Sequence, residues 1–165
     1  MSVDMFIKLG DDIKGSTKDK AQSNNCDVLA YSWGMSQSGS FHTGGGGGAG
    51  KVNIQDLSFT KYQDDASTAI MMHCCTGKHI PKVTMLIRRA GGAIGKPGEK
   101  EVEITMSKVI ITSVSTGGSG GEDRFTENIT LNFAEIKFEN FKQDDKGITK
   151  TAGNLNWNIA ENMGK

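Results

Sequence analysis

The chain has 165 residues, and its 19 Lys and Arg balance 19 Asp and Glu, so the formal net charge is zero. A neutral chain has no overall field to attract nucleic acid or an anionic membrane, and no apolar stretch approaches the roughly 20 residues that span a bilayer. The length favours a single domain, residues 1–165, and the start lacks the basic and apolar regions of a secretory signal. We therefore expect a protein that folds in the cytoplasm and binds no nucleic acid or membrane interior.

Alternation of apolar and polar residues predicts about seven or eight strands. In chain order they are marked by Met5, Ile7 and Leu9; by Cys26–Gln37; by Lys51–Tyr62; by Val83, Met85 and Ile87; by Val102–Val114; by Phe125–Phe141; and by Leu155, Trp157 and Ile159. Many of the 22 glycines gather between these strands, in 44–50, 91–98 and 117–121. Such clusters indicate long loops that join ordered strands.

In three of the predicted strands the apolar side changes partway along. The changes fall around Gln55 and Asp56, at Ser107 and Lys108, and at Ala134 and Glu135. One extra residue reverses every following side chain, so each change predicts a bulge or a sharp coil, unless one strand ends there and another begins. Long strands bent midway let a sheet roll up, which favours a β-barrel made of two rolled, mostly antiparallel sheets.

One short helix is predicted, over Ser67–Thr76. Asp64, Asp65 and Ser67 are competent N-caps, and Gly77 supplies a C-terminal stop. A helix of roughly three turns is marginal alone in water, so we expect it to pack on the sheet. The expected fold is therefore mainly β, a barrel with one helix packed on it.

The segment Gly45–Lys51 matches part of a phosphate-binding loop, the pattern GxxxxGK. Val52 follows where a Ser or Thr would bind the metal, and a strand follows in place of the helix that would hold the phosphates. We therefore expect a flexible loop here and no cofactor.

Possible metal ligands or a cysteine nucleophile gather near the helix end, at His73, Cys74, Cys75 and His79. Adjacent cysteines point to different sides of a helix, so only Cys75 and His79 could converge, which is too few for zinc. Gly77 separates these two, and no nucleophile elbow is present. We expect thiols without a metal site, a disulfide framework or a catalytic role.

Two further patterns have ordinary structural explanations. The acidic pairs at 64–65 and 144–145 are expected to cap a helix and a turn rather than to act as general acids. Tyr31, Trp33 and Met35 share one strand face, which is more typical of a core than of a platform for sugar or single-stranded nucleic acid. No catalytic residue is predicted, and we do not expect an enzyme.

Five segments, taken together, carry a resemblance to a known family. They are Tyr31–Ser40, Ala49–Val52 after the glycine run, Gln55–Tyr62, Thr76–His79 and Leu131–Glu139. In this order, over essentially the whole chain, they resemble the Hcp family, the haemolysin-coregulated tube proteins of bacterial type VI secretion. The chain departs from the family at Thr68, where a proline is frequent, and at Glu101–Glu103, where an aromatic is usual.

The resemblance implies a β-barrel subunit that assembles into hexameric rings, and rings that stack into the inner tube of a contractile apparatus. It also implies three kinds of partner besides the protein itself: a tip spike protein, a contractile sheath and small effector proteins carried in the lumen. The subunit would be assembled in the cytoplasm and then secreted by the apparatus. The family core brings no enzymatic activity.

A barrel of about eight strands is filled by its own side chains, so a channel must lie between subunits. The predicted ring-stacking contact is the glycine loop, through Gly44, Gly45, Gly46, Gly47, Gly48 and Lys51, because a side-chain-poor loop can add backbone hydrogen bonds to an exposed strand edge. Two alternatives remain at this stage. One is a phage-type tail tube subunit, and the other is a carbohydrate-binding β-barrel that would expose Trp33 and Trp157 on one face.

Overall fold

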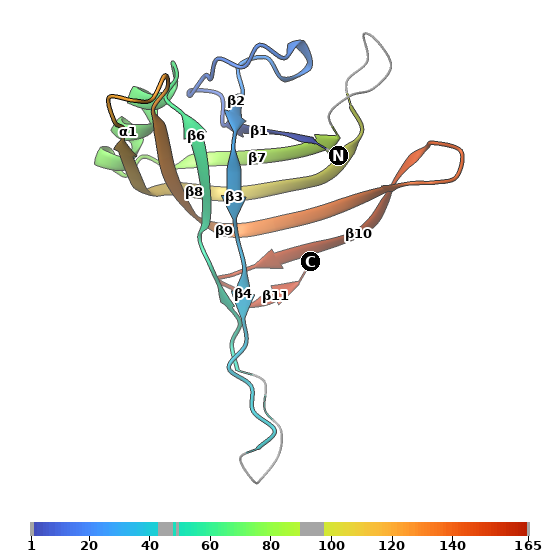
Figure 1. Cartoon of the computed structure of the whole chain (residues 1–165). Coiled ribbons are helices and arrows are strands. Elements are labelled where there is room, and N and C mark those ends of the chain that lie inside the picture. Colours follow the sequence, from blue (N-terminus) through green and yellow to red (C-terminus); the bar gives the residue numbers. More distant parts are fainter. Residues whose placement is uncertain (1, 43–47, 49, 90–97, 165) are drawn as a thin grey trace.

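The computed structural model describes residues 2–42, 48, 50–89 and 98–164, and most of this part of the chain is β-strand (Figure 1). The helical elements are α1 (Ser67–Thr76) and the short 3-10 helix η1 (Lys20–Gln22). The strands are β1 (Val3–Leu9), β2 (Cys26–Val28), β3 (Ala30–Ser32), β4 (Met35–Ser36), β5 (Asn53–Ile54), β6 (Leu57–Tyr62), β7 (Ile80–Arg89), β8 (Lys100–Gly117), β9 (Thr126–Gln143), β10 (Thr149–Asn158) and β11 (Met163–Gly164).

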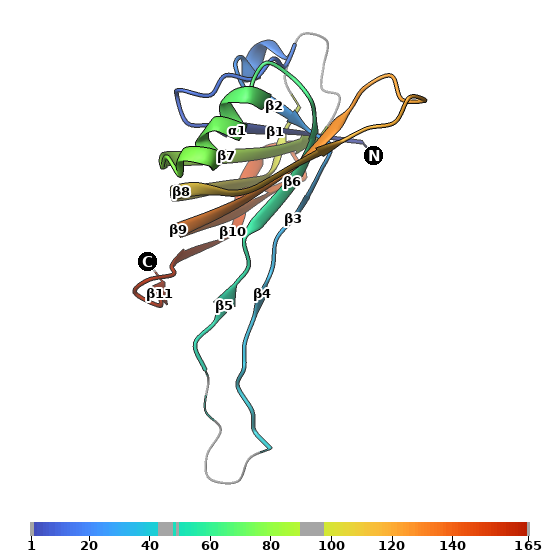
Figure 2. The same ribbon diagram turned by 90° about the vertical axis from the view of Figure 1, so that its left-hand side faces the viewer.

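The main sheet is antiparallel and closes on itself. Its strands follow the order β11-β10-β9-β8-β7-β1-β2, and β6 pairs with both β3 and β9. Only Leu29 separates β2 from β3, and its amide donates to the Thr60 carbonyl at 2.8 Å. The continuous β2–β3 run therefore joins the two ends of the sheet, from β1 on one side to β6 on the other (Figures 1 and 2). This closure confirms the predicted barrel of rolled antiparallel sheets.

The barrel interior is filled by apolar side chains from every wall. Those at most 1% exposed include Ile7, Leu9, Leu57, Phe59, Val83, Met85, Ile104, Met106, Val109, Ile129 and Leu131. Ile70 of α1 is fully buried against the same core. Interiors packed in this way leave no passage through the subunit.

In β8 and in its neighbour β9, the side chains that face the core switch from one side of the strand to the other, and the two switches lie next to each other in the sheet. The buried set passes from Ile104 and Met106 to Val109 and Ile111 in β8, and from Leu131 and Phe133 to Ile136 in β9. Ser107 and Glu135 are register partners where the switches lie, and Lys108 beside Ser107 has a φ of 54°. Both predicted changes are confirmed, and they mark the place where the sheet coils to close the barrel.

The third predicted change, around Gln55 and Asp56, has another cause. β5 ends at Ile54 and pairs with β4, whereas β6 begins at Leu57 and pairs with β3 and β9. The prediction of a bulge is therefore wrong here, and the alternative of two successive strands is right. The predicted strand over Cys26–Gln37 divides in the same way into β2, β3 and β4, because its parts pair with three different partners.

The helix begins and ends where the sequence predicts. The Asp64 carboxylate accepts from the Ala66 amide at 2.9 Å, and the Ser67 hydroxyl accepts from the Asp64 amide at 2.9 Å, so the two side chains cap the first turn together. Gly77 ends the helix with a φ of 67°, a conformation that favours glycine. No helix in the described parts of the chain has the length and apolar character needed to cross a membrane.

Candidate assembly surfaces

The segment resembling a phosphate loop lies only partly within the described residues. Gly44–Gly47 and Ala49 are outside them, while Gly48 forms a bridge with Ser40 and Lys51 is exposed. The chain then continues into strand β5, so no helix N-terminus faces this loop. The backbone donors that a phosphate site takes from a following helix are therefore missing.

The cysteine and histidine side chains near α1 do not converge. Cys74 is half-buried, Cys75 is exposed, and the Nδ1 atom of His73 donates to the Ala69 carbonyl of the same helix at 2.8 Å. The described residues contain no group of three or more His, Cys, Asp or Glu side chains placed to hold a metal. Cys26 of β2 is buried, whereas Cys75 lies on the solvent side of the helix.

These positions predict a clear order of thiol reactivity. Burial, and then the nearby Asp64 carboxylate, raise the pKa of the Cys26 thiol to about 12. At about pH 8 we expect a disulfide reagent to label Cys75 quickly and Cys26 only after unfolding, because the thiolate is the reactive form. The substitution Cys75→Ser should remove the fast phase, and a fast phase that survived this change would contradict the assignment.

The two acidic pairs have the structural roles that the sequence predicts. Asp64 caps α1 and also pairs with Lys61, its carboxylate lying 2.7 Å from the Lys61 ammonium. Asp144 accepts from the amides of Lys146 and Ile148, both at 2.9 Å, within the β9–β10 turn. Since both carboxylates already hold backbone amides in place, neither pair resembles an acid–base dyad.

Of the three residues predicted to share a core face, Tyr31 and Trp33 pack against the core, whereas Met35 is 47% exposed. The Trp33 ring stacks on Phe138, with 5.8 Å between centroids and 18° between planes. Trp157 is also half-buried, and the indole Nε1 atoms of both tryptophans are inaccessible to solvent. The shared exposed face that a carbohydrate site needs is therefore not formed by these two rings.

One part of the chain projects from the barrel. Strands β4 and β5 form a hairpin that projects away from the barrel, and its described residues are 33–42, 48 and 50–54 (Figure 2). Met35 pairs with Ile54 and Ser36 with Asn53, and a bridge between Ser40 and Gly48 follows. A two-stranded ribbon is marginally stable by itself in water. The hairpin is therefore suited to being held by a partner.

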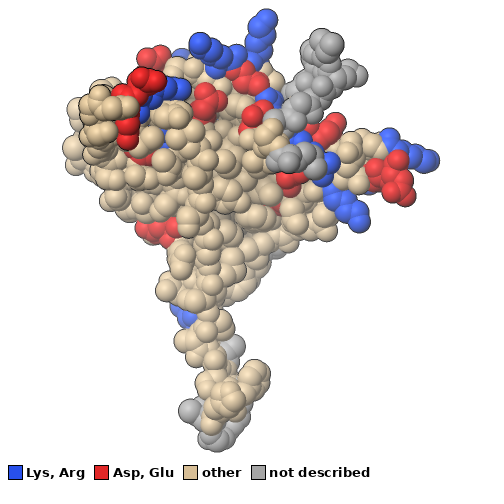
Figure 3. Space-filling model, viewed as in Figure 1, with Lys and Arg blue, Asp and Glu red and all other residues tan. Residues whose placement is uncertain are grey.

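The chemistry of the hairpin supports the same conclusion. Between Trp33 and Gly50 the sequence contains no Asp, Glu, Lys or Arg. In Figure 3 the described part of the projection beyond its base is tan, whereas blue and red side chains are spread over the body and blue atoms lie at the base of the projection. Phe41 is 91% exposed and Met35 is 47% exposed. Large apolar side chains on an uncharged projection mark an interaction surface.

A second uncharged surface covers one side of the barrel, and we call it the hydroxyl face. Register aligns Ser32, Ser58, Thr130 and Ser113 in one row across β3, β6, β9 and β8, and Ala30, Thr60, Asn128 and Ser115 in the next. The Thr60 hydroxyl donates to Asn128 Oδ1 at 2.6 Å, and the hydroxyls of Ser58 and Thr130 lie 3.2 Å apart. The sequence reasoning missed this face, although the alternate Asn128, Thr130 and Asn132 of β9 signalled it.

Comparison with known proteins identifies the family. The family described as type VI secretion system effector, Hcp, matches residues 6–139. Protein hcp1 of Pseudomonas aeruginosa is 55% identical over 168 aligned positions, which cover 99% of both chains. The solved structure of a type six secretion system protein has a TM-score of 0.89 at 26% identity and covers 99% of this chain and all of its own. Hcp1 from Salmonella typhimurium has a TM-score of 0.78 at 30% identity, with 100% of each chain covered. The chain thus belongs to the Hcp family of type VI secretion proteins.

Proposed function

We propose that this protein is the structural subunit of a type VI secretion inner tube. Copies form a hexameric ring, rings stack into a tube, and the tube is exported with a tip spike through contraction of an outer sheath. The role is mechanical, so it requires no cofactor and no catalytic residue. The observation that carries the proposal is the hairpin, which has no Asp, Glu, Lys or Arg between Trp33 and Gly50, projects from the barrel and exposes 91% of Phe41.

The filled barrel supports a channel between subunits rather than within one. Its core side chains, such as Phe59 and Met106, are almost fully buried and occupy the interior. A ring closes when each subunit presents two different complementary surfaces to its neighbours, and a further unclosed contact along the axis gives a filament. The hairpin projects from one end of the molecule, as an axial contact requires (Figure 2).

The hydroxyl face is the best candidate for the lining of that channel. Its two rows, which include Ser58 and Thr130, cross four paired strands and contain no charged residue. The Asp56 carboxylate lies at the border of the face, where it accepts from the Asn132 amide at 2.8 Å. Such a surface repels neither acidic nor basic cargo and offers hydrogen bonds to either. Small effector proteins of different charge could therefore pass along one lining, which suits a transport tube.

Native mass spectrometry of the purified protein tests the ring. We expect a dominant hexamer, and electron micrographs at high protein concentration should show stacks of rings with a central channel. A protein that stayed monomeric at high concentration would overturn the proposed function. A ring with another number of copies would show that the proposed hexamer is wrong, whereas the proposed tube would remain.

A further inference from the structure

A pocket of about 410 Å³ lies where the end of β6 meets the loop that leads into β9. Its charged and aromatic lining residues come from segments far apart in the sequence, and they are Lys18, Asp27, Tyr62, Asp64 and Arg124. The Gln63 amide donates to the Phe125 carbonyl at 2.9 Å. This hydrogen bond fixes the backbone on either side of the contact between Tyr62 and Arg124.

Arg124 is held in an orientation that suits the binding of an anion. Its guanidinium carbon lies 3.9 Å from the centroid of the Tyr62 ring. Although Glu122 and Asp123 precede it in the same loop, Arg124 forms no ion pair with any described residue. A guanidinium that stacks on an aromatic ring keeps the N–H groups at its edge free, and a carboxylate can accept two of them side by side.

The other charged groups of the pocket are two acids that already have donors and one cation that has no acid. The Asp64 carboxylate lies 2.7 Å from the Lys61 ammonium. The Asp27 carboxylate accepts from the Thr17 hydroxyl at 2.7 Å. Lys18, in contrast, is exposed and has no ion pair in the described parts of the chain. An anion that enters the pocket therefore meets two cations without partners.

The pocket lies at one end of the hydroxyl face. Half-buried and buried residues alternate along β6, so Tyr62 is on the same side of the strand as Ser58 and Thr60. Its register partner on β9 is Thr126, which places the two in the row that follows Thr60. In the proposed function the hydroxyl face lines the channel. The pocket is then at one end of that lining, and every subunit of a ring contributes one copy.

We propose that this pocket binds the carboxylate of an acidic segment of a transported protein, an inference that rests on the proposed tube function. The edge of the Arg124 guanidinium binds both carboxylate oxygens, and the Lys18 ammonium adds a further donor. Leu29, which also lines the pocket and is 42% exposed, offers an apolar contact to the aliphatic part of a Glu side chain. The uncharged rows beyond the pocket lack cations, so they do not hold the same segment.

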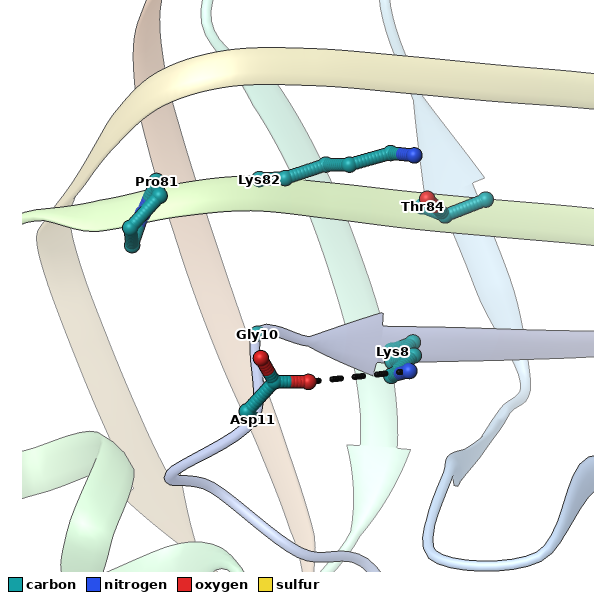
Figure 4. A pocket seen from close by; sticks show the side chains of 6 residues that line it. All are labelled: Lys8, Gly10, Asp11, Pro81, Lys82 and Thr84. Atoms are coloured by element: carbon teal, nitrogen blue, oxygen red, sulfur yellow. Dashed lines mark ion pairs between the residues drawn. The ribbon is translucent and has the colours of Figure 1, made fainter.

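A second groove, of about 200 Å³, provides a matched control (Figure 4). It contains Lys82, another exposed lysine that has no ion pair among the described residues. Lys8 and Asp11 pair there at 3.8 Å, and none of the described lining residues is aromatic. Lys82 therefore measures the general attraction between a surface lysine and an acidic ligand.

The fluorescence anisotropy of a labelled oligoglutamate peptide tests the pocket. The titration is made at low ionic strength, because salt screens contacts between exposed charges. We expect saturable binding, and no binding of an oligoglutamine peptide of the same length. Arg124→Gln should weaken the binding at least about tenfold and Lys18→Gln severalfold, whereas Lys82→Gln should leave it unchanged. Arg124→Lys keeps the charge without the planar guanidinium, and it should retain only part of the affinity.

The outcomes separate this proposal from the proposed function. An equal loss of binding in Arg124→Gln and Lys82→Gln would show a general attraction of charges and would overturn the pocket. Inorganic phosphate that competes as strongly as the peptide would overturn the polypeptide as the ligand. Both results would leave rings and tubes intact. Absence of rings would overturn the proposed function, whereas peptide binding needs only one subunit and would still test the pocket.

Discussion

Replacing Lys61 with Met is expected to lower the free energy of unfolding by about 3–5 kcal/mol. Lys61 of β6 is fully buried, and its ammonium group lies 2.7 Å from the Asp64 carboxylate and 3.1 Å from that of Glu127. Glu127 of β9 is also fully buried. The substitution removes the positive charge and leaves the Glu127 carboxylate in the core without its ion pair, and this uncompensated charge is the source of the loss.

Chemical denaturation at one fixed protein concentration measures this effect, since assembly makes stability depend on concentration. Lys150→Met is the matched control: Lys150 is 69% exposed and lies 3.6 Å from Asp144, so its loss should cost at most about 1 kcal/mol. The double variant with Lys61→Met and Glu127→Leu should recover much of the stability, because the fully buried Glu127 carboxylate is gone and the Asp64 carboxylate, which is 12% exposed, keeps its hydrogen bond from the Ala66 amide. A loss at Lys61 no larger than that at Lys150 would show that the pair does not hold β6 to β9.

The parts of the fold that the sequence predicts are those set by local patterns. The helix over Ser67–Thr76 follows from its caps and from Gly77, which act within a few residues. The changes of buried side in β8 and β9 follow from alternation along one strand. Around Gln55 the same kind of pattern has a different cause, because pairing partners decide whether a strand bends or ends, and a single sequence does not show them.

The surfaces depend on pairing and were therefore harder to predict. The hydroxyl face forms only when β3, β6, β9 and β8 come into register, so its residues are scattered along the chain. The buried ion pair of Lys61 and Glu127 could have been predicted from the alternation of apolar residues. Lys61 falls on the inward-facing side with Leu57 and Phe59, and Glu127 falls on the inward-facing side with Ile129. Two opposite charges at inward positions of two strands indicate that those strands pair. The glycine loop was predicted as a contact, and most of its residues lie outside the described part of the chain.

Shortening the hairpin is expected to abolish tubes and to leave rings. In the proposed variant an Asn-Gly turn replaces residues 37–52, which retains the pairs of Met35 with Ile54 and of Ser36 with Asn53. None of the described residues of the replaced segment belongs to the barrel core, so the subunit should keep its stability and its ring mass. Stacking should fall at least about tenfold, because the axial contact has lost both its backbone acceptors and Phe41.

Sedimentation and electron microscopy at high concentration measure the stacked fraction. A full-length hairpin with Phe41→Ser separates the two contributions, since it removes the aromatic ring and keeps the backbone. If the Phe41 side chain supplies most of the contact energy, this variant should stack as poorly as the shortened one. If the hairpin backbone supplies most of it, the variant should stack nearly as well as the unmodified protein. Tubes of normal length from the shortened variant would mean that another surface joins the rings. The uncharged projection would then need a different partner, outside the stack, to explain why 91% of an aromatic side chain is left in water.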